Sequence, residues 1–244
     1  MTHATTCDTP QLTKAPSAFQ AIWEELQVAL AALFASAAWR RVAFFLLPYV
    51  GLILGLDLAA HYGAVTDAPL PSQFFISQDR GFGEFLEYSL TAASALMLGV
   101  LWWRSREAIY LVLSGVFAFL TLDNSLEFHE RFGHKVAPYM PQGTPLPAND
   151  IGELLLFLSI GLALAVSYLM AMHRSRLRPL VYGLVIGAGI AGAAFFGIVA
   201  DVITSWGIKS DELIEFEAWI EDGGEFGMII LTFLATLAIY DTER

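Results

Sequence analysis

Long uncharged apolar segments alternate with short charged connectors along most of the 244-residue chain. Segments of this kind are long enough to cross a bilayer as α-helices, which takes about 20 residues. The pattern therefore predicts a bundle of about six transmembrane helices. They are expected at about Val42–Ala60, Glu84–Trp103, Ala108–Glu130, Asp150–Met172, Leu180–Ser205 and Gly223–Tyr240.

The region before the first span also has a helical pattern, from residue 17 to residue 38. Its apolar part after Glu25 is short of the roughly 20 residues that a span needs. We interpret it as an interfacial amphipathic helix, with Trp23 and Trp39 at the level of the lipid headgroups. Residues 1–16 are polar and are predicted to be a disordered tail. The predicted organisation is thus a tail (1–16), an interfacial helix (17–38) and a transmembrane domain (39–244).

Composition narrows the fold class further. Hydrophobic residues make up 56% of the chain, charged residues 15%, and the mean hydropathy is +0.58. These values are typical of a membrane protein rather than of a soluble domain, so we predict an all-α polytopic membrane helix bundle. The net charge of −11 and the lack of a basic patch argue against nucleic-acid binding.

The distribution of charge predicts the orientation. If the N-terminus is inside, nine of the 13 Lys and Arg residues fall on the inner side of the membrane. By the positive-inside rule, we expect a multi-pass protein of a bacterial inner (plasma) membrane with both termini in the cytoplasm. Eighteen of the 24 acidic residues then fall on the outer side. Acidic residues scarcely influence insertion, so this bias needs another explanation.

The end of the third span carries the densest group of ionisable residues. Asp123, Glu127, Glu130 and His134 are spaced i, i+4, i+7 and i+11. On one continuous helix they would lie within about 40° of each other. Three carboxylates on one stripe repel one another unless they are protonated, paired or bound to a cation. On a strict helix His129 points elsewhere and would join the stripe only if the helix frayed.

The other predicted spans bring further acids to the same side of the membrane. These are Asp57 beside His61, then Glu84, Glu87, Asp150, Glu153, Asp201, Glu221, Asp222 and Glu225. At helix N-termini such acids serve as caps and complement the helix dipole, which accounts for Glu84. At C-terminal ends within apolar surroundings the dipole is unfavourable, so Asp123 and Asp201 call for a bound cation. The acidic segment Asp211–Glu217 is expected to be a solvated loop.

Together these patterns predict a carboxylate and histidine cation site at the outer face. The candidate metal ligands are Glu87, Asp123, Glu127, His129, Glu130, His134, Glu153, Asp201, Glu221 and Glu225. Glu130 and Glu153 are also candidate catalytic general bases. A mixed set of carboxylates and imidazoles suits Fe, Mn or Zn, and an all-oxygen set suits Ca. The Glu-x-x-His pattern of bundle di-iron sites and the His-Glu-x-x-His pattern of zinc proteases are both missing.

Two short strings, LDNSLEFHE and IEDGGEFG, resemble a group of uncharacterised bacterial multi-pass membrane proteins. In that group an acid and a His-Glu pair end one helix, and an acidic pair with a further Glu opens the last. The resemblance points to Asp123, His129, Glu130, Glu221, Asp222 and Glu225. Asn124 stands where another acid is expected. The resemblance implies no activity.

Three classes of function fit these features. The first is a metal-dependent enzyme that acts on a lipid or another membrane-soluble substrate. The second is a non-catalytic protein that binds an ion, senses it or scaffolds a complex. The third is a cation or proton transporter, although the inner halves of the spans are almost purely apolar. Besides the lipid bilayer, a partner membrane helix is expected at the Gly-rich fifth span, where small residues allow close approach.

Overall fold

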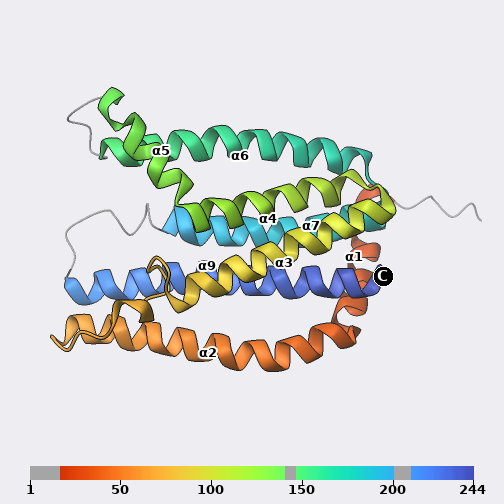
Figure 1. The fold of residues 1–244 in the computed structure, drawn as a ribbon. Helices are drawn as coiled ribbons and strands as arrows, with labels where there is room; N and C mark the ends of the chain where they lie inside the picture. Colours follow the sequence, from red (N-terminus) through yellow and green to blue (C-terminus); the bar gives the residue numbers. More distant parts are fainter. Residues whose placement is uncertain (1–16, 141–146, 201–209) are drawn as a thin grey trace, which may run out of the picture.

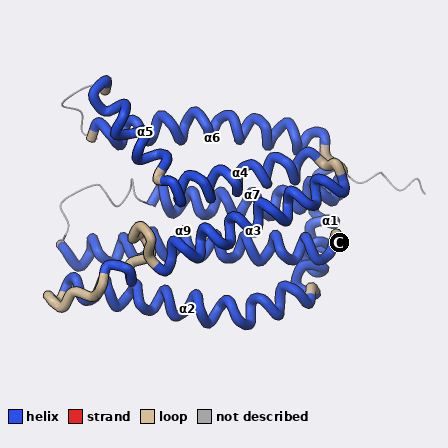
Figure 2. Tube along the Cα trace, in the orientation of Figure 1, coloured by secondary structure: helices blue, strands red, loops and turns tan. Residues whose placement is uncertain are grey.

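Six long helices lie side by side and form the body of the molecule (Figure 1). The computed structural model describes residues 17–140, 147–200 and 210–244. The six helices are α2 (Ala37–Val65), α3 (Phe82–Ser105), α4 (Ala108–Leu126), α6 (Ala148–Arg174), α7 (Leu177–Ala194) and α9 (Asp211–Thr242). Figure 2 shows only helices and loops in the described chain. The all-α fold class is confirmed, and each of the six predicted spans overlaps one of these helices.

A further helix, α1 (Ala18–Ala35), runs across the end of the bundle where the C-terminus also lies (Figure 1). Seven described helices are long and apolar enough to cross a membrane, and α1 is one of them, with the lowest window hydropathy, 1.2. The interfacial position predicted for residues 17–38 stays a prediction. The remaining six candidates coincide with the predicted spans.

Polar contacts fasten α1 and the end of α9 to the same end of the bundle. Ser36 caps α2, and its hydroxyl donates a hydrogen bond to Asp241 at 2.7 Å. The Arg178 guanidinium lies 3.8 Å from Glu25 of α1 and 3.5 Å from Glu243 just after α9. Both ends of the described chain are therefore tied together, opposite the end where α4 stops.

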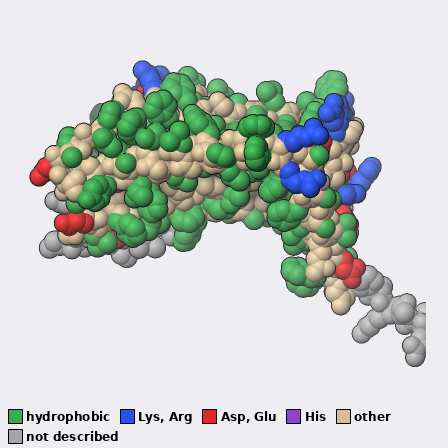
Figure 3. Space-filling view, turned by 90° about the horizontal axis from the view of Figure 1, so that it is seen from below, with side chains coloured by type: hydrophobic (Ala, Val, Ile, Leu, Met, Phe, Trp, Pro, Cys, Tyr) green, Lys and Arg blue, Asp and Glu red, His purple; other side chains and the backbone are tan. Residues whose placement is uncertain are grey.

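Large apolar side chains fill the interior and also cover the outside. Leu98 and Ile186 are fully buried where α3 and α7 meet the core, whereas Leu162 of α6 is 67% exposed. Figure 3 shows apolar side chains over the middle of one face, with most visible Lys and Arg at one end. An apolar exterior of this extent is stable in lipid rather than in water. The chain is thus a multi-pass membrane protein that sits in a lipid bilayer.

The glycines of α7 are used inside the bundle. A Cβ on Gly189 would collide with the Thr232 side chain of α9, and one on Gly183 would lie 2.6 Å from Ile109 of α4. The small residues therefore let α4 and α9 approach α7 closely. A partner helix at this span stays a prediction, but these glycines already have a role within the chain.

The last helix begins earlier than expected. Asp211–Glu217, predicted to be a loop, forms the first turns of α9, so that prediction was wrong. A helix of 32 residues is about 48 Å long, well beyond the roughly 30 Å of the hydrocarbon layer. Its acidic first turns therefore extend past the apolar layer.

The short elements are η1 (Ser72–Phe74), α5 (Phe128–Val136), η2 (Ala137–Tyr139) and the π-helix η3 (Phe195–Ala200).

Candidate functional site

A bend at Glu127 determines the geometry of the site. Helix α4 ends at Leu126, and Glu127 takes φ 50° and ψ 44°, in the left-handed region that non-glycine residues rarely adopt. Helix α5 starts directly afterwards in a new direction (Figure 1). The prediction of one helix from Ala108 to Glu130 was therefore wrong, and the continuous stripe from Asp123 to His134 does not form.

Asp123 stabilises this bend through two contacts with one residue. Its side chain is only 2% exposed. One carboxylate oxygen accepts the backbone N–H of His129 at 3.0 Å, and the other lies 3.0 Å from His129 Nδ1. Asp123 thus caps the first turn of α5 and fixes the orientation of the His129 imidazole. The other ring nitrogen, Nε2, is not bound by Asp123. The two contacts with His129 compensate the buried carboxylate of Asp123 without a bound cation. We therefore interpret Asp123 as the residue that orients His129.

The bend places His129 on the wall of a cavity of about 220 Å³, formed by the loop before α3, by α3, by the bend and by α9. The lining residues are Ile76, Ser77, Asp79, Glu84, Glu87, Asn124, Glu127, His129, Glu130, Asp222 and Glu225. Seven of them are carboxylic acids, and none of the described lining residues is Lys or Arg. We name this cavity the acidic pocket.

Some of these acids have partners outside the pocket. The Glu127 carboxylate lies 3.6 Å from an Arg80 nitrogen and 3.4 Å from an Arg131 nitrogen. Glu84, in the first turn of α3, accepts the backbone N–H of Arg80 in the loop just before the helix. These two carboxylates are therefore partly compensated without a bound ion.

Glu87 and Glu225 differ, because within the described chain neither side chain forms a hydrogen bond or an ion pair. Both are half-buried, and the charge of Glu225 acts directly on Glu87. The Glu225 carboxylate packs against Gly197 of η3, where any Cβ would collide with it. π-Helical turns are frequent at functional sites. Two carboxylates that have no partner in the described chain thus line the acidic pocket.

His129 and Glu130 are tuned by their surroundings. The hydrogen bond with Asp123 raises the pKa of His129 and outweighs burial, which lowers it. Burial raises the pKa of Glu130, and the negative charge of Asp79 adds to this shift. His129 Nε2 lies 4.0 Å from a Glu130 oxygen. Both shifts favour the protonated forms in the absence of any bound cation.

The structure brings half of the ten predicted ligands to the acidic pocket. These five are Glu87, Glu127, His129, Glu130 and Glu225. His129 joins because of the bend, which turns it inward from the direction that a strict helix would give it. The pocket also contains Asp79, Glu84 and Asp222, which the predicted ligand set leaves out. Asp79 comes from the loop before α3, and only its closeness to Glu84 in sequence could have drawn attention to it.

The other predicted ligands take different positions. Glu153 of α6 packs against Gly133 of α5, near His129 and Glu130, but it does not line the pocket. His134 is exposed on α5, and Glu221 lies beside the pocket-lining Asp222 with a partner of its own. Asp201 lies outside the described residues. The roles predicted for these side chains stay predictions.

A second group of ionisable residues lies behind the loop that forms one pocket wall. Asp57 of α2 is fully buried and accepts the backbone N–H of Ile76 at 2.9 Å. His61, one turn later, places Nδ1 2.6 Å from Glu215 of α9 and Nε2 3.5 Å from Asp57. This group ties α2 and α9 to Ile76, which itself lines the acidic pocket.

The open form of the pocket limits how an ion could be held. Among the described residues, no three His, Cys, Asp or Glu side chains converge closely enough to hold a metal ion. A cation in the pocket would therefore keep part of its water shell or draw the side chains inward. Mg²⁺, a small ion that gives up its water reluctantly, is often bound in this way through one or two direct carboxylate ligands.

Comparison with known proteins places the chain in a family. No curated protein and no solved structure matches it. One family model matches residues 82–239, from the start of α3 almost to the end of α9. The matched region contains both sequence strings and every pocket residue outside the preceding loop. The match covers more than half of the chain, which therefore belongs to the family described as a domain of unknown function (DUF8692).

Proposed function

We propose that the protein is a membrane protein that binds a divalent metal cation in the acidic pocket. The observation that carries this proposal is the gathering of seven carboxylic acids around one cavity without a basic residue in its lining. Carboxylates at such a density repel one another unless protons or a cation neutralise them. Glu87 and Glu225 are the best ligand candidates, since neither has a partner within the described chain.

The donor set narrows the choice of metal. Carboxylate oxygens dominate, which favours Ca²⁺ or Mn²⁺. The imidazole of His129 favours Mn²⁺, Fe²⁺ or Zn²⁺, because nitrogen donors suit these ions better than Ca²⁺. Asp123 holds His129 by Nδ1, the arrangement in which a carboxylate orients a metal-ligating histidine. His129 is therefore the residue that distinguishes the two groups of metals.

Calorimetric titration of the detergent-purified, chelator-treated protein with Ca²⁺, Mn²⁺, Zn²⁺ and Fe²⁺ tests the proposal. We expect one of these ions to bind near stoichiometrically to the wild type. The Glu87→Gln/Glu225→Gln variant should lose that binding. Glu24→Gln/Glu212→Gln removes the same charge from exposed positions and should bind like the wild type. A wild type that binds none of the four ions would overturn the proposal.

A single further variant identifies the donor set. If the imidazole is a ligand, His129→Gln should weaken Mn²⁺ or Zn²⁺ binding while leaving Ca²⁺ binding almost unchanged. If only oxygens coordinate the ion, His129→Gln should affect all ions alike and weakly. Either result assigns the metal class without requiring a known substrate.

Hydrolysis of a lipid-like substrate is the second candidate, and the Asp123–His129 pair favours it. An imidazole oriented by a buried carboxylate is the usual form of a general base. A cation in the pocket would lower the pKa of its bound water, and His129 Nε2 or Glu130 would accept the proton. The test is release of headgroup or fatty acid from phospholipid in mixed micelles. The His129→Ala/Glu130→Gln variant should abolish it, and turnover that survives both changes would exclude the mechanism.

A transport role receives less support. Leu98, Leu113 and Ile186 are buried in the core that joins the two ends of the bundle. Along α3 and α9, the buried polar residues between the acidic pocket and the opposite end are Thr91, Ser94, Thr232 and Thr236, and none of the side chains on these stretches is acidic or basic. Ion pathways within a membrane usually contain such ionisable side chains. By the positive-inside rule, we place the pocket at the outer face of a bacterial inner membrane, an orientation that rests on charge alone.

A further inference from the structure

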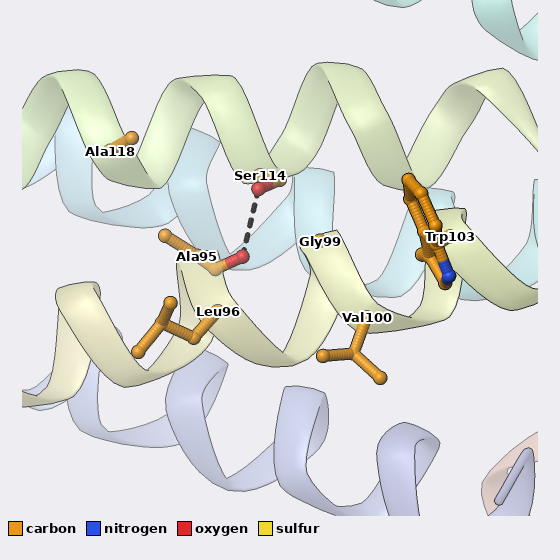
Figure 4. Close-up of a pocket in the computed structure, with 7 residues that line it drawn as sticks. All are labelled: Ala95, Leu96, Gly99, Val100, Trp103, Ser114 and Ala118. Carbon is orange, nitrogen blue, oxygen red and sulfur yellow. Dashed lines mark hydrogen bonds between the residues drawn. The ribbon is translucent and has the colours of Figure 1, made fainter.

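A second cavity, of about 390 Å³, opens on the side of the bundle between α3 and α4 (Figure 4). Its lining includes Ala95, Gly99 and Trp103 of α3 and Ser114 and Ala118 of α4. The one hydroxyl among them, on Ser114, donates to the backbone oxygen of Ala95 at 2.8 Å. Apart from the indole N–H of Trp103, the lining offers no free polar group, and it suits a hydrocarbon ligand. We name this cavity the α3–α4 groove.

The length of the groove matches one leaflet of a bilayer. From Ala95 to Trp103 it follows α3 for eight residues, about 12 Å. One leaflet contributes roughly half of the 30 Å hydrocarbon layer, about 15 Å. Leu96 and Trp103 flank the groove and are 72% and 65% exposed, so it opens toward the lipid. A lipid chain that lies in one leaflet fits this length better than a crossing helix, which would pack along the whole span.

Positive charge lies at the Trp103 end of the groove. The Arg106 guanidinium carbon is 4.6 Å from the centre of the Trp103 ring, and Arg104 directly follows Trp103. Both arginines are exposed, and neither forms an ion pair within the described chain. Glu107, the nearest acid in sequence, is buried and paired with Arg176 at 3.2 Å. Tryptophan at a helix end is typical of the headgroup level, where these arginines would meet phosphate.

We propose that the α3–α4 groove binds a phospholipid whose headgroup carries a net negative charge. One acyl chain lies along Gly99 between α3 and α4, and the phosphate contacts Arg104 and Arg106. This site is independent of the acidic pocket, because it ends at the opposite end of α3. The acyl chain supplies affinity for any phospholipid, and the two arginines supply the preference for an anionic one.

Native mass spectrometry measures both the overall affinity for phospholipid and the preference for an anionic headgroup. The delipidated protein is titrated with phosphatidylglycerol and with phosphatidylcholine of identical acyl chains. The wild type should bind phosphatidylglycerol more tightly. Arg104→Gln/Arg106→Gln should lose roughly thirty-fold in phosphatidylglycerol affinity and keep its phosphatidylcholine affinity. Arg41→Gln/Arg174→Gln removes the same charge from exposed residues at that end and should keep the preference.

Filling the groove should act differently from removing charge. Gly99→Leu should weaken binding of both lipids alike, and Gly161→Leu is the matched control, since no atom lies within 4 Å of a Cβ there. A Cβ on Gly99 would lie 3.3 Å from the Ser114 hydroxyl, so Ala118→Leu provides a second filling variant. Its melting temperature reports whether it is folded.

Three results would overturn the proposal. The wild type could bind the two lipids equally, or both double arginine variants could lose the preference to the same extent. The filling variants could also leave lipid binding intact and dissociate a dimer instead. That last outcome would assign the groove to a second copy of the chain.

Discussion

Asp123→Asn tests whether a buried carboxylate holds His129 as an imidazolium. The amide keeps the shape of the side chain and an oxygen for the His129 N–H, but it removes the charge beside Nδ1. Hydrogen bonds to charged groups contribute about 1.5–3 kcal/mol. Because the side chains of Asp123 and His129 are only 2% and 24% exposed, solvent screens the pair weakly. We expect the melting temperature to fall by roughly 3–12 °C.

The loss should depend on pH in a defined direction. The hydrogen bond that His129 donates to Asp123 raises the pKa of His129, while burial lowers it. Without the carboxylate the largest cause that raises the pKa is lost, and only the more distant charges of Glu153 and Glu130 still oppose burial, so the pKa of His129 falls. Stability from a raised histidine pKa is fully present below the ordinary value near 6.5 and is lost as pH rises through the folded-state pKa. The deficit of the variant is therefore largest near pH 6 and smaller at alkaline pH.

Two measurements check this reasoning. The imidazole Cε1–H signals of ¹³C-histidine-labelled protein in micelles give the pKa, with His129→Gln to assign one of the five histidines. Melts at both ends of the pH range give the stability. Asp67→Asn is the control, since Asp67 is exposed and its left-handed backbone suits Asn. An unchanged His129 pKa in Asp123→Asn, or a deficit that is equal at every pH, would refute the ionic pairing.

Three further outcomes are expected. Gly152→Val should destabilise the α5–α6 contact by about 1–3 kcal/mol in thermal melts. The reason is that a Cβ on Gly152 would meet Val136 and lie 2.9 Å from Gly133 Cα, whereas the control Gly161→Val should melt like the wild type. Burial raises the pKa of Glu130, so Mn²⁺ affinity measured by calorimetry should increase as pH rises through that pKa; Glu130→Gln should flatten this dependence, and a flat wild-type profile would contradict it. A reporter fused after Arg244 should be cytoplasmic, and an outward-facing reporter would reverse the orientation.

The spans could be predicted because the bilayer demands about 20 uncharged residues for each crossing, whatever the sequence. The residues at which the helices begin and end were harder to predict, because hydropathy identifies only the part of a helix that lies in the hydrocarbon layer. The predicted span Val42–Ala60 extends to Ala37–Val65 as α2. The acids from Asp211 onward suggested a loop by composition, yet helical hydrogen bonding continues into the aqueous phase, where acids at an N-terminus are favourable.

The arrangement of the site could not be read in the same way. The string around Glu127 contains neither Gly nor Pro, so nothing local marks a break. The bend is fixed by contacts of Asp123 with a residue beyond it, and these exist only in the folded chain. A continuous helix would therefore place His134 with the acids and point His129 away from them. With the bend, His129 lines the acidic pocket and His134 does not. The residue types were predictable, and their positions depended on one backbone torsion.

The contact between His61 and Glu215 has a consequence for biosynthesis. Asp57 and His61 belong to α2, but Glu215 lies 154 residues later in the chain, in α9. At about 5–20 residues per second, roughly 8–30 s of translation separate them. During that interval the newly made α2 holds a buried ionisable pair without its final partner, which is costly within a bilayer. Stable packing of α2 therefore requires α9 to be made first. A nascent chain truncated before α9 should be a preferred target of membrane proteases.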